Sequence, residues 1–60
     1  MKKTYVTEDK KPGSSYFRIG KALVRIDFDS NGEYATSTEI FQRAIENSHA
    51  FKSGEITLKQ

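Results

Sequence analysis

The sequence predicts a small α+β domain, in which a small antiparallel sheet of four to five short strands, built on a β-hairpin, packs against one helix. Three observations support this prediction. Residues 22–28 alternate apolar and polar side chains, which is the period of a half-buried strand. Asn31-Gly32 is a tight-turn dipeptide shortly after that strand. Residues 36–47 then place apolar side chains at helical spacing.

The N-terminal part, residues 1–14, is predicted to be a basic arm attached to a single small domain over residues 15–60. Residues 4–8 are short and β-branched, which suits an edge strand. Pro12-Gly13 is a turn dipeptide in a charged loop. The basic residues of the arm are Lys2, Lys3, Lys10 and Lys11. Beyond the arm, basic and acidic residues balance, so the net charge of +2 belongs to the N-terminal end.

A β-hairpin is predicted from residues 15–19 and 22–28, which flank a turn at Gly20-Lys21. Alternation places two sets of side chains of residues 22–28 on opposite faces. The inward set is Ala22, Val24, Ile26 and Phe28, and the outward set is Leu23, Arg25 and Asp27. Residues 33–35 are expected to add a brief strand with Tyr34 toward the core. Residues 55–59 are expected to form the last strand, with Ile56 and Leu58 inward.

The single helix is predicted to begin with a capping box, in which Thr36 is the N-cap and Glu39 follows three residues later. Its apolar stripe consists of Ile40, Phe41, Ala44 and Ile45, and its polar face consists of Gln42, Arg43, Glu46 and Asn47. The helical period ends near Asn47-Ser48, so the helix is expected to end there.

Length and composition exclude several classes of protein. Sixty residues make one domain at most, and such a chain buries only about 60% of its unfolded surface. Cysteine is absent, so no disulfide adds stability. The chain is too short for a cleft that buries a substrate and separates two carboxyl pKa values, so neither catalysis nor a cofactor is expected. A partner or an oligomer would supply the apolar burial that the chain lacks.

Targeting signals are also missing from the sequence. No apolar run approaches the roughly 18 residues of a membrane span. Lys2 and Lys3 are not followed by the apolar stretch of a signal peptide. We therefore expect a cytoplasmic protein, or a component of a virus particle assembled in the cytoplasm.

A calcium-binding loop is one interpretation of residues 27–32, which match the pattern D-x-D-x-N-G. Asp27, Asp29 and Asn31 would supply the oxygen ligands. Thr38, however, stands at the twelfth position, where such loops need a bidentate carboxylate. The other interpretation is a plain hairpin turn, in which Asp29 and Asn31 hydrogen-bond to their own backbone.

His49 is the only histidine of the chain. Without cysteine or a second histidine, the chain lacks the ligands of a structural zinc site. A catalytic histidine would need a nucleophile and an orienting carboxylate in three dimensions, and the sequence shows only the adjacent Ser48 and nearby Glu46. The expected role of His49 is to hydrogen-bond carbonyls at the end of the helix.

The hairpin is predicted to have a second apolar face. Tyr16 and Phe17 are consecutive, so they must point to opposite faces of a strand. On the outward face of the facing strand, Leu23 lies between the polar residues Lys21 and Arg25 and makes the same demand. A partner or a second copy could cover this face, or the N-terminal arm could fold over it. Base stacking by exposed aromatic residues is a further alternative, although Arg18 and Arg25 are the only cations nearby.

Residues 32–56 resemble a group of small accessory proteins of tailed bacteriophages. The shared pattern is Gly32-x-Tyr34-x-Thr36, a capped helix with Ala44-Ile45-Glu46, and then Ser48-x-x-Phe51-x-x-Gly54-x-Ile56. The resemblance covers about half of the chain and implies a structural or accessory part of a virion, which binds other proteins and catalyses nothing. It implies no site residues.

The functional prediction is a non-enzymatic protein-interaction module that docks into a larger assembly or associates with itself. The residues predicted to bind the partner are Tyr16, Leu23 and Arg25 on the hairpin, with Lys2, Lys3, Lys10 and Lys11 in the arm. The alternatives are a small regulator that binds nucleic acid or a host protein, and a calcium-responsive module that uses Asp27, Asp29 and Asn31.

Overall fold

Five strands and two helices make up the computed structural model of this chain, which describes residues 1–59. Their bounds are β1 (Lys3–Thr7), β2 (Gly13–Ile19), β3 (Ala22–Phe28), β4 (Glu33–Thr36), α1 (Glu39–Glu46), α2 (His49–Lys52) and β5 (Ile56–Leu58). All strand pairs are antiparallel, and α1 packs against the strands. The predicted small α+β class is confirmed.

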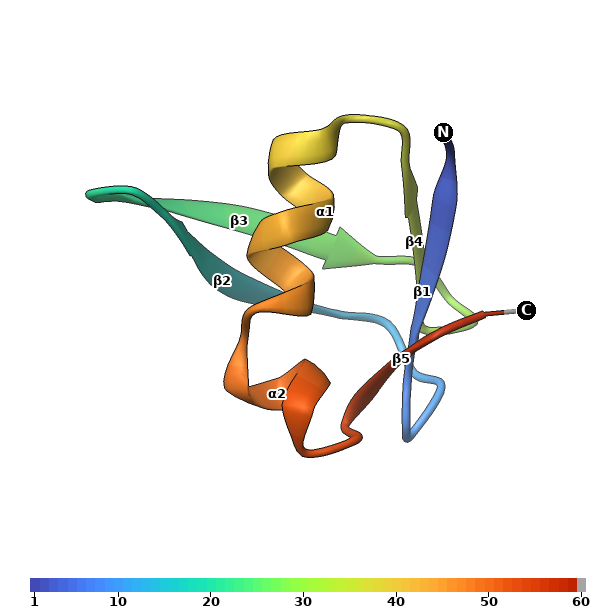
Figure 1. Cartoon of the computed structure of the whole chain (residues 1–60). Helices are drawn as coiled ribbons and strands as arrows, with labels where there is room; N and C mark the ends of the chain where they lie inside the picture. The colour runs from blue at the N-terminus through green and yellow to red at the C-terminus, as the bar shows by residue number, and fades with distance from the viewer. Residues whose placement is uncertain (60) are drawn as a thin grey trace.

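The strands form two sheets, where the sequence analysis predicted a single sheet. One is the hairpin β2-β3, and the other has the strand order β4-β1-β5. In Figure 1 the hairpin reaches to the left past α1, while β1, β4 and β5 lie to the right. The tip of the hairpin therefore projects away from the rest of the molecule.

The position of β1 corrects the prediction of an N-terminal arm with an edge strand over residues 1–14. β1 is the central strand of its sheet, because Tyr5 pairs with Tyr34 of β4 on one side and with Leu58 of β5 on the other. The side chain of Tyr5 is fully buried. Short length and β-branched residues fit a central strand as well as an edge, and only pairing with distant segments decides between them.

Six side chains form the core between the hairpin, α1 and the three-stranded sheet: Tyr5, Phe17, Ile26, Phe28, Ile45 and Ile56. Tyr5 meets Phe51 of α2 edge to face, with ring centroids 6.1 Å apart. Phe28 meets Tyr34 in the same way at 6.3 Å. The predicted inward positions of Tyr34, Ile56 and Leu58 are confirmed, since each is buried or packs against this core.

The hairpin follows its predicted pairing. Ile19 pairs with Ala22 across the two-residue turn, and the register continues to Gly13 and Phe28. Gly20 has φ 59°, the conformation that glycine supplies at the first central position of such turns. Ile26 and Phe28 are buried and Val24 is half-buried, while the alternate residues of β3 are exposed. The period-two pattern is therefore confirmed from Leu23 to Phe28, whereas Ala22, predicted to face inward, is exposed because it lies beside the turn at the projecting tip of the hairpin.

The start of the helix differs from the predicted capping box. The N-cap is Thr38, and its side chain makes no capping hydrogen bond. Thr36 stays in β4, where it pairs with Lys3, and its Oγ1 accepts a hydrogen bond from the Thr38 N–H at 3.1 Å. Glu39 binds Arg43 one turn ahead instead of reaching back. Pairing with β1 thus holds Thr36 in the sheet and delays the helix by two residues.

The faces of α1 are also rotated from the prediction. Ile45 is buried as predicted, but Ile40 is 57% exposed and Gln42 is buried. Gln42 Nε2 donates to the carbonyl oxygens of Met1 at 2.6 Å and Thr36 at 2.8 Å. Met1 lies two residues before β1 and Thr36 ends β4, so Gln42 holds α1 to the N-terminal end of the chain and to β4. Glu46 lies one turn further along the same side of the helix and also contacts β1.

A second, short helix was not predicted. Ser48 caps it, because its side chain accepts the N–H of Phe51 at 3.2 Å and its hydroxyl donates to the Ile45 carbonyl at 2.6 Å. The turn between the helices brings Ala50 and Phe51 back onto the core. Gly54, with φ 89°, then ends α2 and leads into β5.

Gly32 is the position where two turns approach each other most closely. Its φ is 72°, and a Cβ atom there would lie 2.4 Å from Thr7 Oγ1 and 2.7 Å from Lys10 Cα. The Gly32 carbonyl accepts the Thr7 N–H at 2.8 Å, which joins the β3–β4 turn to the end of β1. A side chain at this position would therefore push the turn off β1.

We expect Gly32→Ala to lower the free energy of unfolding by about 3 kcal/mol, because it adds left-handed strain to a backbone clash. Gly54→Ala is the matched control, since Gly54 also has positive φ but open space around it. It should lose only about 1 kcal/mol. Urea unfolding monitored by circular dichroism measures both. Equal losses in the two variants would show that the contact with Thr7 and Lys10 does not matter.

Candidate interaction surface

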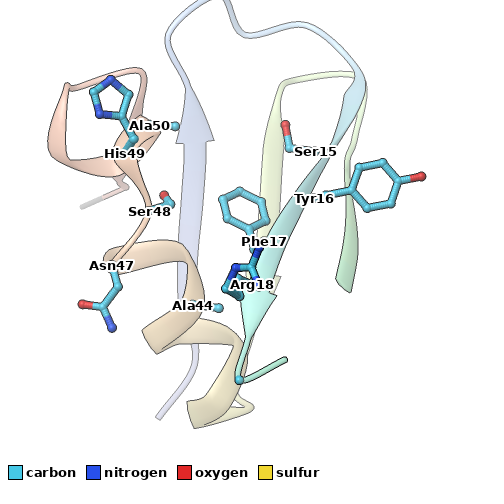
Figure 2. Close-up of a pocket in the computed structure, with 10 residues that line it drawn as sticks. Ser15, Tyr16, Phe17, Arg18, Ala44, Asn47, Ser48, His49 and Ala50 are labelled. Atoms are coloured by element: carbon cyan, nitrogen blue, oxygen red, sulfur yellow. The ribbon is translucent and has the colours of Figure 1, made fainter. Parts of the chain in front are cut away.

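The outward-facing side of the hairpin carries the most exposed apolar side chains of its two strands. Tyr16 is 65% exposed and Leu23 is 61% exposed, whereas Phe17 next to Tyr16 is buried. Figure 2 shows Tyr16 pointing away from the helices and Phe17 pointing toward them. The prediction that Tyr16 and Leu23 lie off the core face is confirmed. We call this surface the outer hairpin face; its residues are Ser14, Tyr16, Arg18, Leu23, Arg25 and Asp27.

The strand register brings these residues together. Tyr16 lies directly opposite Arg25, and Arg18 lies directly opposite Leu23, so the two apolar side chains sit diagonally between two cations. Arg25 Nε donates to Asp27 Oδ1 at 2.8 Å along its own strand. Arg18 has no ion-pair partner among residues 1–59. The outer hairpin face therefore offers apolar area together with one unpaired positive charge.

The four lysines of the predicted arm do not gather at this surface. Lys3 Nζ lies 3.0 Å from Glu46 Oε2, so this lysine forms an ion pair that joins β1 to α1. Lys2 precedes β1, while Lys10 and Lys11 follow it, so the five-residue strand separates them by about 17 Å. Lys10 has φ 54° in the turn, and its N–H donates to the Thr7 carbonyl at 3.2 Å. Residues 3–7 of the predicted basic arm are therefore the central strand of a sheet, and the four lysines do not form one basic segment beside the hairpin.

A partly buried polar cluster, which was not predicted from the sequence, joins β1 to α1. The Tyr5 hydroxyl donates to Glu46 Oε2 at 2.5 Å, and Lys3 donates to the same oxygen. These hydrogen bonds lower the pKa of Glu46 below its ordinary value. Burial, with the nearby Glu46 carboxylate, raises the pKa of the Tyr5 hydroxyl well above its ordinary value. The cluster holds α1 against β1. The only feature of the sequence that indicates it is the helical spacing of Gln42 and Glu46.

Because the pKa of Glu46 is lowered, the stabilisation that this cluster gives to the fold depends on pH. Because the folded carboxyl ionises more readily than the unfolded one, its stabilisation is present at neutral pH and is lost as pH falls through the folded pKa. We expect Glu46→Gln to lower the free energy of unfolding by about 1 to 2 kcal/mol at neutral pH, allowing for partial exposure of the carboxylate. The difference from the wild type should shrink as the pH is lowered to about 3.

Glu39→Gln is the control for this experiment, since Glu39 forms an exposed ion pair with Arg43 on the same helix. Such pairs contribute about 0.3 to 0.5 kcal/mol. Urea unfolding at a series of pH values compares the variants. A difference in the free energy of unfolding between Glu46→Gln and the wild type that does not change with pH would contradict a stabilising role of the ionised Glu46 carboxylate.

The loop between β3 and β4 uses its carboxylate to build a turn. Asp29 Oδ1 accepts the N–H groups of Asn31 at 2.9 Å and Glu33 at 3.0 Å. Asp27 points from β3 to Arg25. Within residues 1–59 there is no group of three or more His, Cys, Asp or Glu side chains placed to hold a metal ion. The geometry is that of the plain hairpin turn, the second interpretation of this segment.

We expect Asp29→Ala to lower the free energy of unfolding by about 1 kcal/mol, because two backbone N–H groups lose their acceptor. Asp29→Asn keeps an oxygen at that position and should be nearly neutral. Thermal unfolding with and without millimolar calcium checks the loop further, and no shift in Tm is expected. Stabilisation by calcium that Asp29→Asn removes would instead favour the calcium-binding interpretation.

An open groove of about 640 Å³ runs between β2 and the junction of the two helices. Its walls are formed by Ser15, Tyr16, Phe17, Arg18, Gly20, Ala44, Asn47, Ser48, His49 and Ala50. Figure 2 shows Ala44 and Ala50 directed toward β2, where their small side chains leave this space open. His49, the first residue of α2, is exposed and lies on the rim of the groove. No acidic side chain lines the groove among the described residues.

Comparison with protein-family models, curated proteins and solved structures gives no match to this chain. Among residues 1–59, no helix has the length and apolar character needed to cross a membrane.

Proposed function

We propose that this protein is a non-enzymatic protein-interaction module that docks through its outer hairpin face, either onto further copies of itself or into a larger assembly. The observation that supports this proposal is the pairing of two large exposed side chains, Tyr16 and Leu23, on one face of a projecting hairpin. Burying such side chains contributes about 1.5 to 3 kcal/mol each. Aromatic residues and arginine are also the types most enriched at the centres of protein interfaces.

The side of the hairpin opposite to this face packs in the core. Phe17, Ile26 and Phe28 anchor the opposite side of the same two strands in the core. A docking partner would therefore meet a preformed surface and would not have to order it, which lowers the entropic cost of association. The unpaired charge of Arg18 favours a partner surface that combines apolar and acidic groups.

The setting that we propose for this docking is a tailed-bacteriophage particle or its assembly pathway. The resemblance of residues 32–56 to phage accessory proteins supports that setting. In such an assembly many copies of a small chain pack side by side, and subunit contacts would supply the apolar burial that a sixty-residue chain provides only in part.

We expect the purified chain to form a closed oligomer, and we expect Leu23→Asp to dissociate it without unfolding the protomer. The aspartate would place an unpaired charge in the contact, which costs several kcal/mol if the site is desolvated. Native mass spectrometry and sedimentation velocity measure the mass, and circular dichroism checks the fold.

Ile40→Asp is the matched control, because Ile40 is an equally exposed apolar residue on α1, outside the outer hairpin face. It should leave the oligomer intact. A wild-type chain that stays monomeric at the highest soluble concentration would rule out self-assembly. Unfolding by Leu23→Asp would show that Leu23 serves the fold and would contradict its role in docking.

A further inference from the structure

The edge of β2 that faces the helices carries unused backbone hydrogen-bonding groups. Ile19 and Ala22 close a two-residue turn and exchange both of their hydrogen bonds, as the pair next to such a turn does. Because bonded pairs alternate along an antiparallel ladder, Phe17 and Ser15 also direct their backbone groups to β3. The N–H and C=O groups of Ser14, Tyr16 and Arg18 therefore point to the opposite edge.

Nothing in the described chain satisfies these groups. β2 pairs only with β3, and no backbone or side-chain hydrogen bond within residues 1–59 reaches the backbone of Ser14, Tyr16 or Arg18. β2 and β3 are the longest strands with a free edge, at seven residues each against four in β4 and three in β5, and the β2 edge is the one that borders the groove. Long, unpaired edges are templates for the addition of another strand.

The groove described above lies along this edge. Four consecutive residues, 15–18, line it, although their side chains alternate between the two faces of the hairpin. Lining by consecutive residues means that the backbone edge itself forms one wall. The other wall comes from Ala44 of α1, from Asn47 at the C-terminal end of that helix, and from residues 48–50 at the start of α2. Figure 2 shows Phe17 between the two walls.

This pair of walls selects one kind of occupant. An added strand would lie about 4.8 Å from β2, inside the groove, with its inward side chains against Phe17, Ala44 and Ala50. The hairpin of a second copy would bring a further strand beyond the first, into the position that the helix wall already fills. A single extended segment requires less width between the walls than a second hairpin does.

The charges around the groove further restrict which segment could occupy it. At one end of the groove Arg18 has no ion-pair partner among the described residues, His49 lies on the rim, and no carboxylate lines the groove itself. The hollow that adjoins the other end, at Ser15 and Ala50, is lined by Glu8, Asp9 and Glu55. A segment with its carboxylates at the Arg18 end would complement this arrangement, and a basic residue there would not. Small apolar residues at alternate positions would fit over the alanines.

We propose that the β2 edge and the α1–α2 junction form a second interaction site, which binds an extended acidic segment of a partner protein by strand addition. The segment pairs with the backbone of Ser14, Tyr16 and Arg18, directs alternate small apolar side chains onto Phe17, Ala44 and Ala50, and places a carboxylate beside Arg18. Main-chain hydrogen bonds provide the affinity, and the alternate side chains provide the specificity. This site uses the backbone of Ser14, Tyr16 and Arg18, whose side chains belong to the outer hairpin face, and it does not require docking through Leu23.

A displayed library of random linear peptides, selected on the wild-type chain, provides the probe. Selected peptides should alternate small apolar and acidic residues. Hydrogen exchange read by NMR should then show new protection at the amides of Ser14, Tyr16 and Arg18, and unchanged exchange at Leu23 and Arg25. Failure to select any peptide, or protection elsewhere, would overturn the proposal.

Two variants of one residue separate the backbone from the side chain. Arg18→Ala removes the charge but keeps the N–H, whereas Arg18→Pro also removes the outward N–H and leaves the β2–β3 ladder intact. We expect Arg18→Pro to bind a selected peptide about tenfold more weakly than Arg18→Ala does, since one backbone hydrogen bond is lost. Equal affinity of the two variants would overturn strand addition.

A third variant keeps the proposal testable if Arg18→Pro fails to fold. Ala44→Gln places a longer, helix-compatible side chain in the wall of the groove and should weaken peptide binding about tenfold or more, because it narrows the slot. Unchanged binding by Ala44→Gln would count against the groove. Leu23→Asp should bind the peptide as the wild type does. The proposal for the outer hairpin face and the proposal for the β2 edge can therefore be contradicted independently.

Discussion

The pairing of β1 between β4 and β5 is the constraint on which the rest of the structure depends. β1 comes from the start of the chain and β5 from its end, so the three-stranded sheet closes the two ends of the sequence on each other. Tyr5, at the centre of β1, is completely buried, packs edge to face on Phe51 and donates to Glu46. Both helices are therefore held by one side chain of this strand, and their position fixes the groove beside β2.

The two sheets contribute differently to the molecule. The hairpin β2-β3 is formed by neighbouring residues and needs little long-range pairing, whereas β4-β1-β5 requires the whole chain. The hairpin is attached to the core by Phe17, Ile26 and Phe28 on one side only. Its other side and its free edge remain available for contact because the three-stranded sheet and α1 already supply the rest of the core.

The elements that the sequence predicts correctly are those with a local signal. Alternation specifies β3, Gly20 and Gly32 mark the turns, and the consecutive Tyr16-Phe17 pair requires that one aromatic side chain leave the core. These features depend on residues within one or two turns of each other. They include the outer hairpin face, and for that reason its main residues could be chosen from the sequence.

The features that were missed depend on contacts between distant segments. Nothing local distinguishes a central β1 from an edge strand, and Lys3 appears as a free cation until Glu46 is placed beside it. The polar residue Gln42 is buried because the carbonyls of Met1 and Thr36 converge on it. The same pairing keeps Thr36 in the sheet, so the helix starts at Glu39. The free edge of β2 likewise follows from the absence of a neighbour within the described chain, which a sequence pattern does not reveal.

The two proposed sites, the outer hairpin face and the β2 edge, would differ in the kind of recognition that each supports. A face built from Tyr16, Leu23 and two arginines would recognise side chains, so its specificity would depend on the shape and charge of the opposing surface. An edge of N–H and C=O groups would accept many sequences and would be selective mainly through the groove that encloses it. The two surfaces lie on one hairpin but face different directions. A chain that uses both could hold a flexible acidic segment at the edge while its outer face packs against a folded subunit, which would make a molecule of sixty residues a connector between two different kinds of partner.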